Sequence, residues 1–131
     1  MANELTVGKE NMVSLISDMP FGEVIKPLRQ EILLFDSYIA GTTQVKDESV
    51  FDEIKEGDSL ILQRDPDDRF DENSILIFDE KKRKLGYIPE KDNVVFARLM
   101  DAGKFLIARV NENVTGGPFR KISIGIYLVD F

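Results

Sequence analysis

A polar loop between two apolar runs, within residues 60–78, carries the side chains of this chain that could do chemistry. The runs 60–62 and 75–78 consist of strand-forming residues bounded by turn residues. The polar members of the loop are Arg64, Asp65, Asp67, Asp68, Arg69, Asp71, Glu72 and Asn73. A hairpin connection normally needs only about two to five residues, so this loop has more hydrogen-bonding capacity than a plain connection requires. It could bind a ligand, or its carboxylates could cap its own backbone amides.

Part of this region matches the sequence motif of a metal-dependent nuclease. Pro66-Asp67 followed by Asp79-Glu80-Lys81 matches a PD…DxK pattern, in which two carboxylates bind Mg²⁺ and a lysine assists the attacking water. That chemistry needs the second carboxylate and the lysine inside a strand, whereas residues 79–84 are predicted to form a hairpin tip. The letters also arise readily in a chain that is 31% charged. We therefore disfavour the nuclease interpretation.

Composition removes most other catalytic and metal chemistry. The chain has no cysteine and no histidine, which excludes disulfides, thiol nucleophiles, the usual zinc sites and a histidine general base. A calcium loop starting at Asp65 would need glycine where Phe70 stands and a bidentate glutamate where Leu76 stands. We expect no catalytic residue, no metal and no cofactor, and we expect that the protein is not an enzyme.

Size and charge set the remaining limits. A chain of 131 residues is long enough to bury most of its apolar surface in one domain. The formal charge of −7 argues against broad electrostatic capture of nucleic acid but leaves room for a local site. The start, MANELTVGKE, does not have the features of a signal peptide, and no apolar stretch approaches the roughly 20 residues of a membrane span. We therefore expect a soluble cytoplasmic protein without a membrane partner.

The first thirty residues show a helical pattern. Met12, Leu15, Ile16 and Met19 fall on one helical face, and Pro20 ends that segment. Residues 21–28 repeat the spacing, although Pro27 opposes a full helix there. We predict that residues 1–30 form an N-terminal helical extension and that residues 31–131 form a separate domain.

From residue 31 onward the pattern favours strands. The predicted strands are 32–35 (buried, and running on towards a bend at Ala40-Gly41), 60–62, 74–78, 85–88, 105–110 and 122–128. Residues 47–54 are expected to form one short helix, and another should begin at Asp92 or Asn93 and stop at Gly103. The inner face of that helix is predicted to carry Val95, Phe96, Leu99 and Met100, and turns are expected at 55–58 and 111–118. The predicted fold is mainly β, a small curled sheet or barrel of the SH3-like or OB-like kind, with about six strands and one to three short helices.

Several short motifs in this order resemble the HIRAN domain. They are Ala40-Gly41, Gly57-Asp58, Leu62-Gln63-Arg64-Asp65-Pro66, Asp71-Glu72-Asn73-Ser74-Ile75 and Leu85-Gly86-Tyr87-Ile88-Pro89. The resemblance covers roughly residue 31 to the C-terminus. It implies a small β-barrel that captures single-stranded DNA or DNA 3′ ends, in a role linked to DNA repair or processing.

The resemblance also implies site residues. Asp71 falls on the aspartate that accepts a hydrogen bond from the 3′-hydroxyl, and an ionised carboxylate accepts such a bond but repels a terminal phosphate. Phe70 keeps an aromatic ring in the same loop, and Tyr87 offers a second flat surface. The residues that the resemblance assigns to nucleic-acid binding are Thr43, Gln44, Asp68, Arg69, Phe70, Asp71 and Tyr87.

The chain departs from the family pattern after Gly41. Where end-binding members carry a basic residue followed by two tyrosines, this chain has Thr43, Gln44 and Val45. Each base stacked on an aromatic ring contributes roughly 1–3 kcal/mol of binding free energy, so the absence of two such rings is a large loss. Asp68 stands where DNA-binding relatives have a neutral amide, and Glu90 replaces a basic residue. The alternative function is therefore a protein-interaction or self-association module on the same fold, with the DNA-end site decayed.

A purely structural role is the other interpretation of the loop. Asp71 and Asn73 could hold the loop through Asx-type bonds, and Arg64 could pair with one of the loop carboxylates. Phe70 and Tyr87 could be partly buried core residues. Lys81 to Lys84 are expected to form a solvated hairpin tip, although they are the most basic patch in the sequence.

Overall fold

The computed structural model describes residues 29–114 and 120–130. The predicted helix around Met12–Met19 lies outside the described residues, as does the end of the predicted turn at 111–118. Residues Glu31–Val129 form one compact unit. Within the described residues, no helix is long and apolar enough to cross a membrane.

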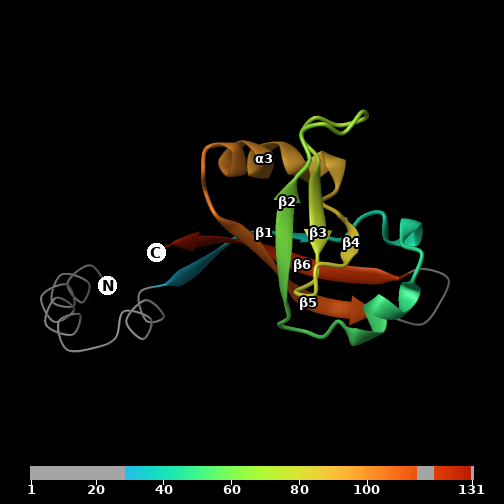
Figure 1. The fold of residues 1–131 in the computed structure, drawn as a ribbon. Helices are drawn as coiled ribbons and strands as arrows, with labels where there is room; N and C mark the ends of the chain where they lie inside the picture. Colours follow the sequence, from blue (N-terminus) through green and yellow to red (C-terminus); the bar gives the residue numbers. More distant parts are fainter. Residues whose placement is uncertain (1–28, 115–119, 131) are drawn as a thin grey trace, which may run out of the picture. The chain divides into compact units, whose positions relative to one another are not determined.

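The compact unit is built on a six-stranded antiparallel sheet, shown in Figure 1. The strands are β1 (Gln30–Tyr38), β2 (Ser59–Arg64), β3 (Ile75–Phe78), β4 (Lys84–Tyr87), β5 (Leu106–Val114) and β6 (Lys121–Asp130). Their order in the sheet is β1-β6-β5-β2-β3-β4. The helical elements are the 3₁₀ helices η1 (Thr42–Gln44), η2 (Glu48–Glu53) and η3 (Glu90–Asp92) and the α-helix α3 (Asn93–Asp101). The predicted mainly-β class, with about six strands and short helices, is confirmed.

Of the two predicted forms, a curled sheet or a barrel, the barrel is wrong, because the sheet is not closed. Its order ends at β1 and β4, and an isolated bridge just beyond β1 joins the two ends. In that bridge the Ala40 amide donates to the Tyr87 carbonyl at 2.9 Å, and the Tyr87 amide donates to the Ala40 carbonyl at 3.0 Å. At Gly41 the backbone takes φ +73° and the chain turns away into η1, so the pairing does not continue.

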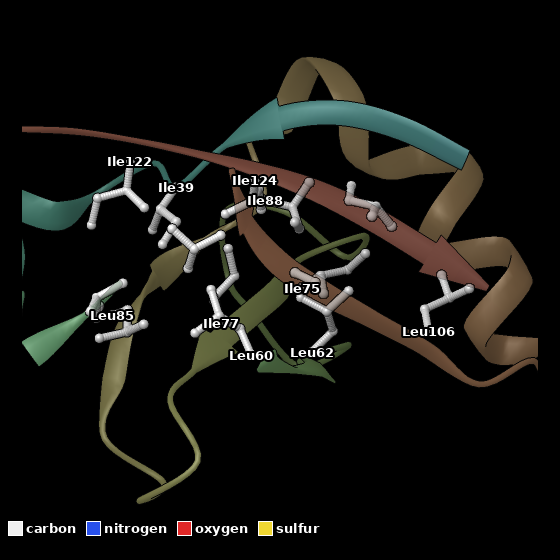
Figure 2. Packing of buried hydrophobic residues seen from close by; sticks show 14 of the residues in the cluster. Ile39, Leu60, Leu62, Ile75, Ile77, Leu85, Ile88, Leu106, Ile122 and Ile124 are labelled. Carbon is white, nitrogen blue, oxygen red and sulfur yellow. The ribbon is translucent and has the colours of Figure 1, made fainter. Parts of the chain in front are cut away.

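The hydrophobic core lies between the strands that curl towards each other (Figure 2). Its fully buried aliphatic side chains include Leu60, Ile75, Ile77, Leu85, Ile88, Ile122, Ile124 and Ile126. The alternation at 122, 124 and 126 therefore identified the inner face of β6 correctly, since successive residues of a strand point to opposite faces. Helix α3 contributes Phe96 and Ala97 to the same core.

Three local predictions need correction. Residues 32–35 do form a strand, but Leu33 is 50% exposed and Phe35 is 44% exposed, because β1 stands at the end of the sheet. Val95 is 65% exposed, since α3 turns Asn93, Phe96 and Ala97 inward instead. Residues 111–114 continue β5 beyond the predicted end at 110, because they pair with β6 across a bulge.

Two other local signals, for the helix at 47–54 and for the stop at Gly103, were correct. η2 occupies most of the predicted helix at 47–54, and the Asp47 side chain caps it by accepting a bond from the Ser49 amide at 3.1 Å. Gly103, at φ +88°, ends α3 with amide bonds back to the last turn, as the glycine signal predicted.

We expect Gly41→Ala to destabilise the protein more than Gly57→Ala. Both glycines have positive φ, which costs an alanine roughly 1–2 kcal/mol. A Cβ at Gly41 would also collide with the Tyr87 ring, whereas a Cβ at Gly57 meets open space. Overpacking adds about 1–3 kcal/mol. Urea denaturation of the two variants measures the difference, and equal midpoints would show that the contact between Gly41 and Tyr87 is not tight.

Candidate functional site

The polar loop connects the end of β2 to the start of β3, and Arg64 holds it at its base. The Arg64 guanidinium forms a two-bond ion pair with Asp101 at the end of α3, at 2.9 and 3.2 Å. It also donates to the backbone carbonyls of Ser74 at 2.7 Å and Glu72 at 3.0 Å. The predicted pairing of Arg64 with a loop carboxylate is therefore wrong. Arg64 instead ties the far end of the loop to its own strand and to the helix.

Two aspartates shape the loop through their own backbone. The Phe70 amide donates to Asp68 Oδ1 at 2.8 Å, and the Asn73 amide donates to Asp71 Oδ1 at 2.9 Å. These are the expected Asx-type bonds. The bond from the Phe70 amide is the main reason that the pKa of Asp68 is lowered, and the positive charge of Lys84 adds to it.

Phe70 extends into solvent beyond this frame. Its side chain is 93% exposed, so the alternative that Phe70 is a core residue is wrong. The loop that carries it extends past the ends of β2 and β3 in Figure 1. A folded loop that presents a bare aromatic ring offers a flat apolar surface to a ligand.

Asp71 is fixed by a residue whose role the sequence did not reveal. The side-chain amide of Asn93, the first residue of α3, donates to Asp71 Oδ2 at 2.6 Å. Asn93 is only 1% exposed, and its Oδ1 has no hydrogen-bond partner within the described residues. The sequence indicated Asn93 only as a candidate helix cap. Each Asp71 oxygen accepts one bond here and keeps a further lone pair for another donor.

Tyr87 and the chain after Gly41 form a second part of the candidate site. Two shallow hollows share Gly41 as a wall. The first hollow is lined by Gly41, Gln44, Val45, Lys46, Lys84, Gly86 and Tyr87. The second hollow is lined by Tyr38, Ile39, Ala40, Gly41, Thr42, Thr43, Arg120 and Lys121.

The structure thus divides the predicted site residues into groups. Asp68, Arg69, Phe70 and Asp71 lie in the loop, Gln44 and Tyr87 line the first hollow, and Thr43 lines the second. Tyr38 supplies an aromatic ring to the second hollow, with the Lys91 ammonium 5.6 Å from its centre. No charge signal in the sequence distinguished Lys46 or Lys121 from other exposed lysines.

Comparison with known proteins now identifies the family. The sequence model of the HIRAN domain matches residues 32–129. This chain belongs to the HIRAN domain family.

Two solved structures share the HIRAN fold seen here, and because their sequence identities to this chain are below 25%, the likeness shows the fold alone. One is a protein from Lactobacillus plantarum, with 24% identity over 79% of this chain and 99% of that chain, and a TM-score of 0.71. The other is the HIRAN domain of human HLTF, with 14% identity over 77% of this chain and 78% of that chain, and a TM-score of 0.62. A search of functionally curated proteins returned no match.

The residues of the nuclease pattern have structural roles in this HIRAN domain. Asp79 is buried and accepts bonds from the Arg83 amide at 2.8 Å and from the Arg83 side chain at 2.7 Å. Lys81 pairs with Glu53 at 3.4 Å, and Arg83 pairs with the same glutamate at 2.7 Å. These contacts fasten the β3–β4 hairpin to η2. Across residues 29–114 and 120–130, no group of three or more acidic side chains is arranged to hold a metal.

Replacing Asn93 by alanine should destabilise the HIRAN domain by about 1–3 kcal/mol, because it removes a buried donor from the Asp71 carboxylate. The matched control is Asn111→Ala, whose amide donates to Asp36 at an exposed position and should change stability by less than about 0.5 kcal/mol. Thermal or urea unfolding measures both. If the two variants unfold alike, the bond between Asn93 and Asp71 is not a stabilising element.

The clamp between Arg64 and Asp101 should respond to pH. The hydrogen bond from the Arg64 guanidinium holds the pKa of Asp101 below its usual value. A lowered folded-state pKa gives a stabilisation that is present above the unfolded pKa and is lost as pH falls through the folded one. The stability difference between wild type and Asp101→Asn should therefore be largest near neutral pH and shrink below about pH 4. Urea midpoints at several pH values test this. A difference that is constant with pH would contradict it.

Proposed function

We propose that this HIRAN domain binds the 3′ end of single-stranded DNA through the polar loop, as a binding module in DNA repair or processing. The HIRAN family is known as a DNA-end-binding module, and this chain belongs to that family. The observation that carries the proposal is that Phe70, whose ring is exposed, stands next in sequence to Asp71, whose carboxylate is held in place by two hydrogen bonds. The loop that holds both is anchored by Arg64 at its base.

Asp71 provides the chemistry that distinguishes a free 3′ end. Its carboxylate is held on one oxygen by the Asn73 amide and on the other by the Asn93 side chain. A carboxylate held in this way accepts a hydrogen bond from a hydroxyl group without first losing side-chain freedom, so little ordering entropy is lost on binding. A 3′-phosphate in the same position would bring negative charge against the carboxylate.

Phe70 provides the contact with the terminal base. Stacking of one base on an aromatic ring contributes roughly 1–3 kcal/mol and tolerates any base. Because Phe70 is already almost fully exposed, a base can reach its face without displacing protein side chains. Because Gln44 and Val45 replace the two tyrosines of the family pattern, Phe70 supplies a larger share of the base stacking here than it would beside them.

The second candidate function is protein interaction or self-association. The exposed apolar residues Ile32, Leu33, Leu34 and Phe35 on β1 favour it. A strand at the end of a sheet with this composition is a ready template for pairing with another chain. Light scattering distinguishes the two candidates, since self-association gives a mass that rises with protein concentration.

Fluorescence anisotropy tests the DNA proposal directly. A short labelled single strand is titrated at about 50 mM salt, where electrostatic contacts are weakly screened. We expect preference for a free 3′-hydroxyl over a 3′-phosphate and over a blunt duplex. A hydrogen bond to a charged group contributes about 1.5–3 kcal/mol, so Asp71→Ala and Asp71→Asn should each weaken binding by about 10- to 100-fold.

The control variant is Asp67→Ala, which removes an exposed carboxylate from the same loop. It should leave the preference for the free hydroxyl unchanged. Phe70→Ala should weaken binding to every single strand alike, because stacking does not read the terminal group. Equal binding of the hydroxyl and phosphate ends by the wild type would refute 3′-end recognition.

A further inference from the structure

The charged side chains that line the two hollows beside Gly41 are opposite in sign to the net charge of the chain. The formal charge is −7, yet the charged residues of the first hollow are Lys46 and Lys84, and those of the second are Arg120 and Lys121. No acidic residue lines either hollow. By contrast, the hollow beside η2 mixes the two signs, with Glu53 and Asp79 set against Lys81 and Arg83. The surface near Gly41 is therefore a local cationic region.

The two hollows differ in how many of their cations are already engaged, because Arg120 of the second hollow has contacts of its own. The Arg120 guanidinium lies over the Phe51 ring, 4.8 Å from its centre, and its Nη1 is 3.8 Å from Asp52. Lys46 and Lys84 are exposed, and within the described residues their ammonium groups form no ion pair or hydrogen bond. The first hollow thus offers two ammonium groups that an incoming anion can use without breaking an existing contact.

The position of the first hollow connects it to the loop. Tyr87 lines it and pairs in the sheet with Leu76, the second residue of β3 after the loop. Lys84 stands at the other end of β4 and lines the same hollow as Tyr87. A chain that leaves the loop along β4 therefore passes the Tyr87 ring and then reaches Lys84 and Lys46.

We propose that Lys46 and Lys84 bind interior backbone phosphates of a single strand whose 3′-terminal nucleotide lies at Phe70 and Asp71. This inference rests on the proposed function and adds the path of the strand. Lys46 and Lys84 line the same hollow, together with Gly41, Gly86 and the Tyr87 ring that packs against Gly41. The cations supply the attraction that the acidic loop does not, which explains how a chain with a charge of −7 can hold a polyanion at one place.

The salt dependence of binding tests the path. A twelve-nucleotide single strand with a free 3′-hydroxyl is titrated with wild type and with the double variant Lys46→Ala/Lys84→Ala. Each lost phosphate contact lowers the slope of log K against log[salt] by about 0.7 for a single strand, so the double variant should lose about 1.4. The charge-matched control is Lys82→Ala/Lys104→Ala, which removes two exposed lysines that line neither hollow and should leave the slope unchanged.

The outcomes separate this inference from the proposed function. If wild type prefers the free hydroxyl and the double variant keeps the full slope, the path is wrong while end binding stands. If Lys121→Ala lowers the slope and the double variant does not, the strand follows the second hollow, and the path is again wrong. If wild type does not bind the strand at all, the proposed function fails and the path fails with it.

Discussion

The fold depends on one close crossing of the backbone, where Ala40 meets Tyr87. This bridge joins the chain just beyond β1 to β4 with two hydrogen bonds, although the sheet does not close into a barrel. The crossing requires glycine on each side, because a Cβ at Gly86 would collide with the Ala40 carbonyl and one at Gly41 would collide with the Tyr87 ring. Both hollows adjoin this contact, since Gly41, Gly86 and Tyr87 line the first and Ala40 and Gly41 line the second.

A second constraint shapes the loop, and it comes from contacts made by β2 and α3. Arg64 and Asn93 reach the loop from β2 and α3, and they hold its carbonyls and its central carboxylate. The loop therefore has a frame made of long-range contacts, although its tip carries an apolar ring in solvent. A loop without such a frame would bury Phe70 against the nearest apolar surface, since exposure of a large apolar side chain costs free energy.

The sequence predicted most of the fold because its local signals agree with the tertiary structure. The alternation in β6, the glycine stop after α3 and the cap of η2 each depend on residues near in sequence. It did not decide between a curled sheet and a closed barrel, because closure depends on how far pairing continues beyond a single bridge. It missed the partners of Arg64 and Asp71 for the same reason, since Asp101 and Asn93 lie 37 and 22 residues away. The position of Lys46 beside Lys84 likewise arises only when η1 packs near β4.

The separate anchoring of the two parts has a consequence for how this domain can change over evolution. The loop is held by β2 and α3, whereas the lysines of the first hollow are held by no polar contact within the described residues. Substitutions at Lys46 or Lys84 alter charge without touching the scaffold, while substitutions at Arg64 or Asn93 alter the scaffold itself. The charge of the first hollow can therefore drift by single surface mutations at little cost in stability, whereas the geometry of the loop is inherited nearly unchanged.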